Sequence, residues 1–315
     1  MIVLFTKIVL AGSVVLATLG FFNASGAAES SAACEPETGQ VVWKRLTYQG
    51  KHFLGKVKTA VSLTELSALA AQKVLISIPE GSALQASTAR VMVLDVQSAV
   101  NPLFGATDIS GSRAWFTSDD AAALQRIRSR RGDDIWQNTY RFSENGVYRI
   151  RKKPGHGKEE NLVPEYWTKI KESFYPYLNN RPGPQAVMEP TGLLYLVSAR
   201  AFREQDASLS LYVFDRKQLH EVKVQVSGRL RLKVSYIEKN QKNNMRREGM
   251  TDTLKISFKP RALAPSDQPP EEFSFMGLRG DFEIYIDAAT AIPVQISGQI
   301  PRIGKVHIRL QAVEI

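Results

Sequence analysis

The sequence predicts a mainly β protein with a few helices, in which an antiparallel meander sheet is curved into a half-barrel or open barrel. Residues 209–237 alternate apolar and polar side chains with period two, the pattern of half-buried strands. Shorter alternating runs return at 254–259, 281–287 and 305–310. Runs of this kind, separated by glycine, proline and polar turns, are typical of antiparallel sheets with one face in water.

Composition narrows the class of protein. The chain has 315 residues, of which 43% are hydrophobic and 23% are charged, as in an ordinary globular protein of one or two domains. Its formal net charge of +10 makes anionic lipids, lipopolysaccharide phosphates and acidic glycans candidate partners, although a basic surface also serves solubility alone. Since Cys34 is the only cysteine, no internal disulfide forms and the fold depends on its apolar core.

The first residues predict an export signal. Lys7 is the only charged side chain before Glu29, residues 8–22 are apolar or small, and small residues follow at 24–28. This order is that of a secretory signal peptide over residues 1–28 that is cleaved, so we expect a periplasmic mature protein. The apolar run is shorter than the roughly 20 residues that span a bilayer, so no stable transmembrane span is expected after cleavage.

Processing decides where the mature chain begins. Cleavage after residue 33 is the alternative to cleavage after residue 28, and residues 29–40 are expected to form a flexible tail. A lipidated cysteine is normally preceded, three residues earlier, by Leu or a similar residue, and Ser31 stands there before Cys34. The sequence therefore favours an unlipidated protein, with lipidation at Cys34 as the alternative. Nucleic acid is not expected as a partner in this compartment.

An N-terminal α+β unit is predicted over residues 41–185. We expect a pair of strands around residues 50–55, with further strands at 74–78 and 91–96 and a loop at 101–111. The motif Ser62-Leu63-Thr64-Glu65 fits a capping box, which predicts a short helix at residues 66–70.

Two longer helices are predicted in the same unit. Ser118-Asp119-Asp120 is typical of a helix N-terminus, because carboxylates there favour the positive end of the helix dipole, and the helix is expected over 121–129. Pro164 suits the first position of a helix that continues to residue 174. Residues 154–161 between them are expected to form a polar loop.

The clearest hairpin of the chain lies between these helices. Strands are predicted at 136–142 and 147–152, and Asn145-Gly146 suits the tight turn because both residues tolerate positive φ. In the return strand, period two places Val147, Arg149 and Arg151 on one face. The hairpin therefore presents basic side chains in a row.

A C-terminal antiparallel β unit is predicted over residues 186–315, after a proline-rich segment. It begins with a short buried helix at 193–202, and polar or proline-rich excursions are expected at 239–252 and 260–272. The two units can also pack as one continuous sheet. Acidic side chains at Asp281, Glu283 and Asp287 alternate in a strand whose neighbours carry basic rows, so opposite charges are expected to meet across strands.

Parts of the C-terminal unit resemble a family of exported bacterial proteins, domain of unknown function 3108. The resemblance covers residues 42–315, with firm matches from Pro190 onward; Tyr48 and Gly55 match the opening strand of the family. The firm matches are Pro190-Thr191-Gly192-Leu193-Leu194-Tyr195 with Arg200, Gly280-Asp281-Phe282-Glu283-Ile284-Tyr285-Ile286-Asp287, Ile292-Pro293-Val294, and Gly304-Lys305-Val306 continued to Leu310. A tryptophan usual in the family near Tyr285 is absent. The resemblance implies an exported β-rich protein of the cell envelope and brings no catalytic residues.

Motifs of the common enzyme classes are missing. The sequence has no Gly-x-Ser-x-Gly, no Gly-x-x-x-x-Gly-Lys followed by Ser or Thr (Val57 follows Gly55-Lys56), and no His-Glu-x-x-His. His156 lies in a glycine-flanked loop, which favours an exposed histidine over a catalytic one. His307 lies between Lys305 and Arg309, and these cations disfavour its protonation. Paired carboxylates such as Asp119-Asp120 and Glu159-Glu160 are adjacent in sequence and do not converge on one substrate atom. We predict no catalytic residues, no metal site and no cofactor.

A non-catalytic binding or scaffold module is the function that the sequence favours. Its ligand would be an amphipathic or anionic molecule of the envelope, held in a sheet concavity, or a protein partner. The candidate ligand-binding residues are Arg149, Arg151, Lys153, Arg229, Arg231, Lys233, Trp136 and Trp167. Aromatic residues that could line such a pocket, or simply form core, are Phe104, Trp115, Trp136, Trp167, Phe174 and Tyr175.

Two alternatives remain open at the level of sequence. A hydrolase acting on an envelope polysaccharide or lipid would need two carboxylates facing one cleft, roughly 5–10 Å apart. Assembly with another protein would need an open edge strand, for which residues 305–310 are the candidate. The sequence does not identify the ligand, the partner or the oligomeric state.

Overall fold

The computed structural model describes residues 40–52, 55–79, 81–86, 90–102, 107–177, 186–199, 208–241, 243–263, 269–301 and 304–315. The predicted signal peptide, its cleavage site, Cys34, Phe104 and Arg200 lie outside the described residues. Residues 36–315 form one compact unit by themselves.

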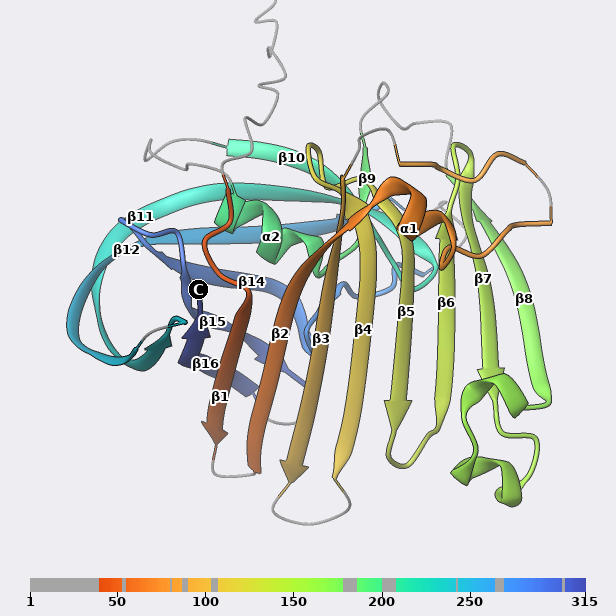
Figure 1. Cartoon of the computed structure of the whole chain (residues 1–315), viewed down its shortest axis with the longest axis horizontal. Coiled ribbons are helices and arrows are strands. Elements are labelled where there is room, and N and C mark those ends of the chain that lie inside the picture. The colour runs from red at the N-terminus through yellow and green to blue at the C-terminus, as the bar shows by residue number, and fades with distance from the viewer. Residues whose placement is uncertain are drawn as a thin grey trace, which may run out of the picture. The chain divides into compact units, whose positions relative to one another are not determined.

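The described residues are mainly β strands, and all of the strands belong to one sheet (Figure 1). The strands are β1 (Arg45–His52), β2 (Gly55–Ser67), β3 (Arg90–Pro102), β4 (Asp108–Thr117), β5 (Ala123–Arg131), β6 (Trp136–Phe142), β7 (Gly146–Lys153), β8 (Lys169–Pro176), β9 (Val187–Met188), β10 (Ser208–Asp215), β11 (Gln218–Lys239), β12 (Asn244–Ala262), β13 (Ser274–Phe275), β14 (Leu278–Asp287), β15 (Pro293–Ile300) and β16 (Gly304–Glu314). The helices are α1 (Ala68–Gln72) and α2 (Gly192–Ala199), with short 3-10 helices at Gly157–Asn161 and Pro164–Tyr166.

The sheet is an antiparallel meander for most of its path. Strands β8 to β1 are neighbours in reverse chain order, and β1 then pairs with β16, so residues from both ends of the unit share one sheet. The path continues through β15, β14, β12, β11 and β10 to β9. Because β16 also pairs with β11, the strands β11, β12, β14, β15 and β16 form a closed circuit of pairings, as in a barrel.

Helix α2 lies inside this arrangement. All eight of its residues are buried, as expected for a helix that is apolar on every side. The Trp43 indole N–H donates to Ser198 Oγ at 3.0 Å, and the Tyr195 hydroxyl donates to the Ser118 carbonyl at 2.8 Å. Since Trp43 precedes β1 and Ser118 follows β4, these bonds connect the helix to the first strands of the sheet.

The helix predicted at residues 121–129 is wrong. This segment is strand β5, which pairs along its length with β4 and β6. Asp120 accepts a hydrogen bond from the Ala122 N–H at 3.0 Å, and Ala121 has a φ of 55°, so the acidic residues close a turn between β4 and β5 and do not begin a helix. Pairing on both sides outweighs the local helix signal.

The helix predicted at residues 164–174 is also wrong. Pro164 begins a single 3-10 turn, and the chain then forms strand β8 against β7. The apolar residues that suggested one helical face, Tyr166, Ile170 and Phe174, are exposed instead of packing as a helix face would.

The N-cap of helix α1 lies five residues after the start of the predicted capping box. Ser62-Leu63-Thr64-Glu65 lies within β2, and the N-cap of α1 is Ser67, whose side chain accepts from the Ala70 N–H at 3.2 Å. The strand predicted at 74–78 is wrong as well. The backbone of Ile76 is bound by side chains, with its N–H donating to Gln125 and its carbonyl accepting from Arg141.

Two predictions for the C-terminal half need correction. The polar excursion predicted at 239–252 is mostly strand, because β12 begins at Asn244. Strand β16 is not the last strand of the sheet, because it lies between β15 and β1. Residues 304–309 pair with β15, β1 pairs with residues from 309 onward, and β11 pairs with residues 312–314. The prediction of a terminal edge strand at 305–310 is therefore wrong.

Other predictions are confirmed. The hairpin of β6 and β7 is present, but its turn residues are Glu144 and Asn145: the Ser143 N–H donates to the Gly146 carbonyl, and Gly146 begins β7. Neither Asn145 nor Gly146 has the positive φ that was expected of them. In β11, Val222, Val224 and Val226 are buried, whereas the intervening polar side chains are exposed. The expected charge pairing between strands is present, since Lys255 Nζ lies 2.6 Å from Glu283 Oε1.

Candidate functional site

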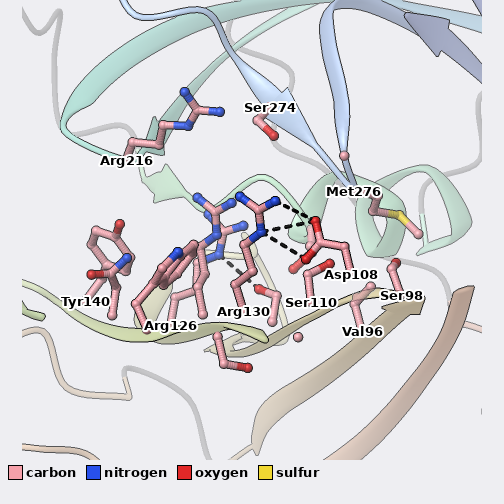
Figure 2. Close-up of a pocket in the computed structure, with 18 of the residues that line it drawn as sticks. Val96, Ser98, Asp108, Ser110, Arg126, Arg130, Tyr140, Arg216, Ser274 and Met276 are labelled. Atoms are coloured by element: carbon pink, nitrogen blue, oxygen red, sulfur yellow. Dashed lines mark hydrogen bonds and ion pairs between the residues drawn. The ribbon is translucent and has the colours of Figure 1, made fainter. Parts of the chain in front are cut away.

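A cationic cavity of about 850 Å³ lies within the described unit. One wall is the inner face of β3 to β7, and the opposite wall is formed by the turns between β10 and β11, β13 and β14, and β15 and β16. Figure 2 shows Arg126 and Arg130 entering from the strand side, with Arg216 and Ser274 across the cavity from them. Eight lining residues are Arg or Lys, against three that are Asp or Glu.

Strand register explains why the cations share one face. Arg126 on β5 pairs with Tyr140 on β6, which pairs with Arg149 on β7. One step along, Arg128 pairs with Asn138, and Asn138 pairs with Arg151. Directly paired residues point to the same side of a sheet, so three adjacent strands present two cationic rows to the cavity.

Two buried carboxylates neutralise the innermost cations. Asp215 and Glu189 are each 1% exposed. Arg126 Nε lies 3.2 Å from Glu189 Oε2, and Arg126 Nη1 and Arg128 Nη1 each lie 3.4 Å from Asp215 Oδ1. Arg216 reaches Asp215 from the opposite wall, at 3.7 Å. Burial and the neighbouring Arg128 lower the pKa of Arg126, but a guanidinium remains charged at neutral pH.

Arg130 and Lys217, which also line the cavity, form ion pairs with carboxylates. Arg130 holds Asp108 with Nε at 2.9 Å and Nη2 at 2.7 Å, and this bond raises the pKa of Arg130. Lys217 lies 3.1 Å from Glu271. Such pairs mean that most of the positive charge of the cavity is already balanced.

Arg149 is the exception among the buried cations that line the cavity. It is only 6% exposed, its Nη2 donates to Ser173 Oγ at 3.4 Å, and its guanidinium lies 5.0 Å from the ring centroid of Tyr175. Among the described residues no carboxylate pairs with it, and its Nε has no hydrogen-bond partner. A buried charge left partly unsatisfied is costly, so it is expected where a ligand completes it.

Asn138 adds a second unsatisfied atom on the same face. Its side chain is 4% exposed, and Oδ1 accepts no hydrogen bond from any residue that the structure describes. Trp136, two residues before it on β6, packs under both flanking cations, with Arg128 at 5.8 Å and Arg151 at 5.6 Å from its ring centroid. Together these side chains make one end of the cavity.

Two residues of the opposite wall have a left-handed backbone conformation. Arg216 and Met276, which both line the cavity, have φ values of 58° and 49°. Each stands at the first position of a two-residue hairpin turn, where positive φ is the rule. These turns place Arg216 and Met276 opposite the strands.

The structure brings together only some of the residues predicted for binding. Trp136, Arg149 and Arg151 line the cavity. Lys153 follows on the same face of β7 and pairs with Asp134 at 2.7 Å. The remaining candidates do not line it: Trp167 is buried beside the 3-10 helices, where its indole N–H donates to the Glu159 carbonyl at 2.9 Å, and Arg229, Arg231 and Lys233 lie on the exposed face of β11.

The cavity residues that the sequence reasoning missed are mainly those of β5. Arg126, Arg128 and Arg130 repeat with period two, which places them on one side of a strand but on different sides of a helix. The helix prediction for this segment hid that signal. Glu189, Asp215 and Arg216 carry no local pattern that points to a cavity.

Comparisons with known proteins add a distant structural likeness. No protein-family model matches the chain, and a search of curated proteins finds no match. Among solved structures, the chain is similar to the crystal structure of a beta-barrel-like protein of domain of unknown function DUF1849 from Brucella abortus, with a TM-score of 0.44 and 7% sequence identity, over 87% of this chain and 98% of that one. A likeness at this level shows neither a shared family nor a shared function.

Two further findings concern the rest of the described chain. Neither α1 nor α2 has the length and apolar character that a bilayer-crossing helix requires. Among the described residues, no group of three or more His, Cys, Asp and Glu side chains is placed to hold a metal ion.

Proposed function

We propose that this protein is a non-catalytic binding module that holds an anionic ligand in the cavity between β3–β7 and the opposing turns. The observation that carries the proposal is Arg149, a buried cation whose Nε has no partner among the described residues. An anion beside it would supply the missing acceptor and charge. Arg128 and Arg151, each of which has a carboxylate partner, line the same end of the cavity.

We further propose that the protein works in the cell envelope after export. The amino-terminal pattern of Lys7, an apolar run and small residues supports removal of a signal peptide. Envelope lipids, lipopolysaccharide and glycans supply anionic groups in that compartment. The resemblance to exported proteins of domain of unknown function 3108 supports the same location.

The ion pairs formed by most carboxylates near the cavity favour binding over hydrolysis. Asp108 is held by two nitrogens of Arg130, and Glu271 is held by Lys217. The buried pair Glu189 and Asp215 is bound by Arg126. A general acid or nucleophile must be free to reach a substrate, and carboxylates engaged in this way serve better as counter-ions. Asp133 is the lining carboxylate without an ion pair among the described residues, and hydrolysis of this kind needs two carboxylates facing one cleft.

Calorimetric titration with inorganic pyrophosphate tests the proposal. We expect binding that weakens as salt is added, because screening reduces the attraction of a charged ligand. Arg149→Met should weaken it by about 10- to 100-fold, the value of one charge-assisted hydrogen bond. Lys152→Met is the matched control, since it removes one charge from the opposite face of β7. Absence of binding, or equal losses in the two variants, would contradict the proposal.

Thermal unfolding of the ligand-free variants separates binding from folding. A buried cation without a carboxylate partner costs free energy, so Arg149→Met should leave stability unchanged or raise it by about 1 kcal/mol. A large loss of stability would show that Arg149 serves the fold.

A further inference from the structure

We infer that the ligand of this cavity is a hydroxylated anion, of which an acidic or sulfated sugar is the simplest form. The inference rests on the proposed function and specifies its ligand. It adds to the anionic group a requirement for hydroxyl groups, and this requirement comes from observations other than the positive charge.

The first observation is the acceptor at Asn138. Its Oδ1 is buried without a partner in the part of the chain that the structure describes, so the ligand must offer a hydrogen-bond donor to it. The adjacent cations Arg128 and Arg151 both lie against Trp136 and do not donate to this oxygen. A fully ionised anion such as a sulfate has no donor, whereas a sugar hydroxyl has one.

The second observation is the chemistry of the remaining walls. Five residues on the cavity side carry hydroxyl groups on short side chains: Ser98, Ser110, Ser112, Thr191 and Ser274. Ser98, Ser112 and Thr191 already bond to Thr59, Arg126 and Glu189, which leaves Ser110 and Ser274 for a ligand. Hydroxyl groups both donate and accept, which suits a ligand that carries several hydroxyls of its own. Short side chains also leave room between the strands and the opposing turns.

The third observation is the spacing of the two unsatisfied groups. Asn138 pairs directly with Arg151, so Arg149 is its diagonal neighbour on the same face of the sheet. Diagonal neighbours lie roughly 7–8 Å apart at the backbone, and the Arg149 guanidinium extends toward β8, where it contacts Ser173 and Tyr175. A ligand that contacts both Arg149 and Asn138 must therefore be at least about as large as one sugar residue.

An alkyl chain finds less support. The aliphatic lining residues are Val96, Val100, Met276, Ile300 and Pro301. They belong to β3 and to the turns after β13 and β15, away from the β6 and β7 residues with unsatisfied atoms. We therefore place the anionic and hydroxyl groups at the end of the cavity formed by β5, β6 and β7.

Equilibrium binding of a matched set of small molecules to the full chain tests this inference. Glucose 6-sulfate and methyl sulfate carry the same sulfate ester, and glucose carries the hydroxyls without the charge. We expect glucose 6-sulfate to bind at least tenfold more tightly than either, as follows from one to two added hydrogen bonds. Glucuronate tests a carboxylate source of the charge, and octyl sulfate tests an alkyl chain.

The variant Asn138→Ala gives an independent measure. It should reduce binding of glucose 6-sulfate about fivefold and leave methyl sulfate unchanged, because only the sugar donates to Oδ1. Gln137→Ala, on the opposite face of β6, is the control and should change neither.

The outcomes distinguish a failure of the hydroxylated-ligand inference from a failure of the proposed anion binding. If methyl sulfate binds as tightly as glucose 6-sulfate, or octyl sulfate binds most tightly, the inference of a hydroxylated ligand is wrong while anion binding stands. If none of the charged probes binds and pyrophosphate does not bind either, the proposed function fails with it.

Discussion

Two buried arginines of the β6–β7 hairpin show how the surroundings decide the role of a residue. Arg141 is 1% exposed and donates to four backbone carbonyls, those of Ile76, Leu84, Leu124 and Phe142. Burial lowers its pKa to about 10. Arg149 is nearly as buried but lacks such a set of acceptors. The first is therefore structural, and the second is available to a ligand.

Arg141→Met tests the structural role. The loss of Arg141 leaves several buried carbonyls without donors, so we expect the free energy of unfolding to fall by about 3–5 kcal/mol. Urea denaturation measures this change. Arg246→Met removes an exposed ion pair with Glu248 and should cost less than about 1 kcal/mol. Similar losses in the two variants would show that Arg141 does not hold the segment between α1 and β3.

His220 gives the fold a dependence on pH. It is 1% exposed, and burial lowers its pKa, although Asp215 and Glu271 act in the opposite direction. The neutral form is therefore favoured in the folded state, whereas the unfolded chain takes up a proton near pH 6.5. Stability attributable to His220 is present above about pH 6.5 and is lost as pH falls through the lower pKa of the folded state.

His220→Gln should flatten the decline of stability below about pH 6.5 while leaving the shape of the curve above that pH unchanged. The measurement is urea denaturation across a pH series. His307→Gln is the comparison and should change the slope less. Partial desolvation and the neighbours Lys305 and Arg309 also lower the pKa of that histidine, but His307 is far more exposed than His220. An unaltered slope in His220→Gln would contradict the assignment.

At the scale of elements, predictions succeeded where one periodicity was clear over many residues. The row of valines in β11 and the apolar run of α2 each fit one structure, and both were found. Prediction failed in β5 and β8, where a proline or acidic residues in front of an apolar stretch imitate a helix start. In both, the deciding interactions are hydrogen bonds to neighbouring strands, which local sequence does not contain.

Gly146 shows how closely β8 approaches β7. A Cβ at this position would lie 2.6 Å from Phe174 Cζ and 2.9 Å from Pro176 Cα, and would also meet the Tyr175 carbonyl oxygen. Gly146→Ala should therefore displace β8, cost about 1–3 kcal/mol and speed amide hydrogen exchange in β8. A Cβ at Gly157 meets no described atom within 4 Å, so Gly157→Ala is the control. Unchanged exchange in β8 would contradict the packing described.

At the scale of the whole unit, the cavity depends on pairings between distant parts of the chain. β1 pairs with β16, and β16 also closes a circuit with β11. These pairings allow the turns after β10, β13 and β15 to face β3–β7. The sequence predicted a curved sheet with cationic rows, and it placed Trp136, Arg149 and Arg151 among the candidates. It could not predict that Asp215 and Arg216 would face them, because that contact exists only after the sheet closes.

The central claim is that an anion contacts Arg149 inside this cavity, and nuclear magnetic resonance of the arginine Nε–Hε groups tests it most directly. The Arg149 signal is identified by its disappearance in Arg149→Lys. On titration with glucose 6-sulfate, the account predicts that this signal shifts and saturates with the same affinity as the calorimetric binding. A titration that saturates while the Arg149 signal stays in place would contradict the account.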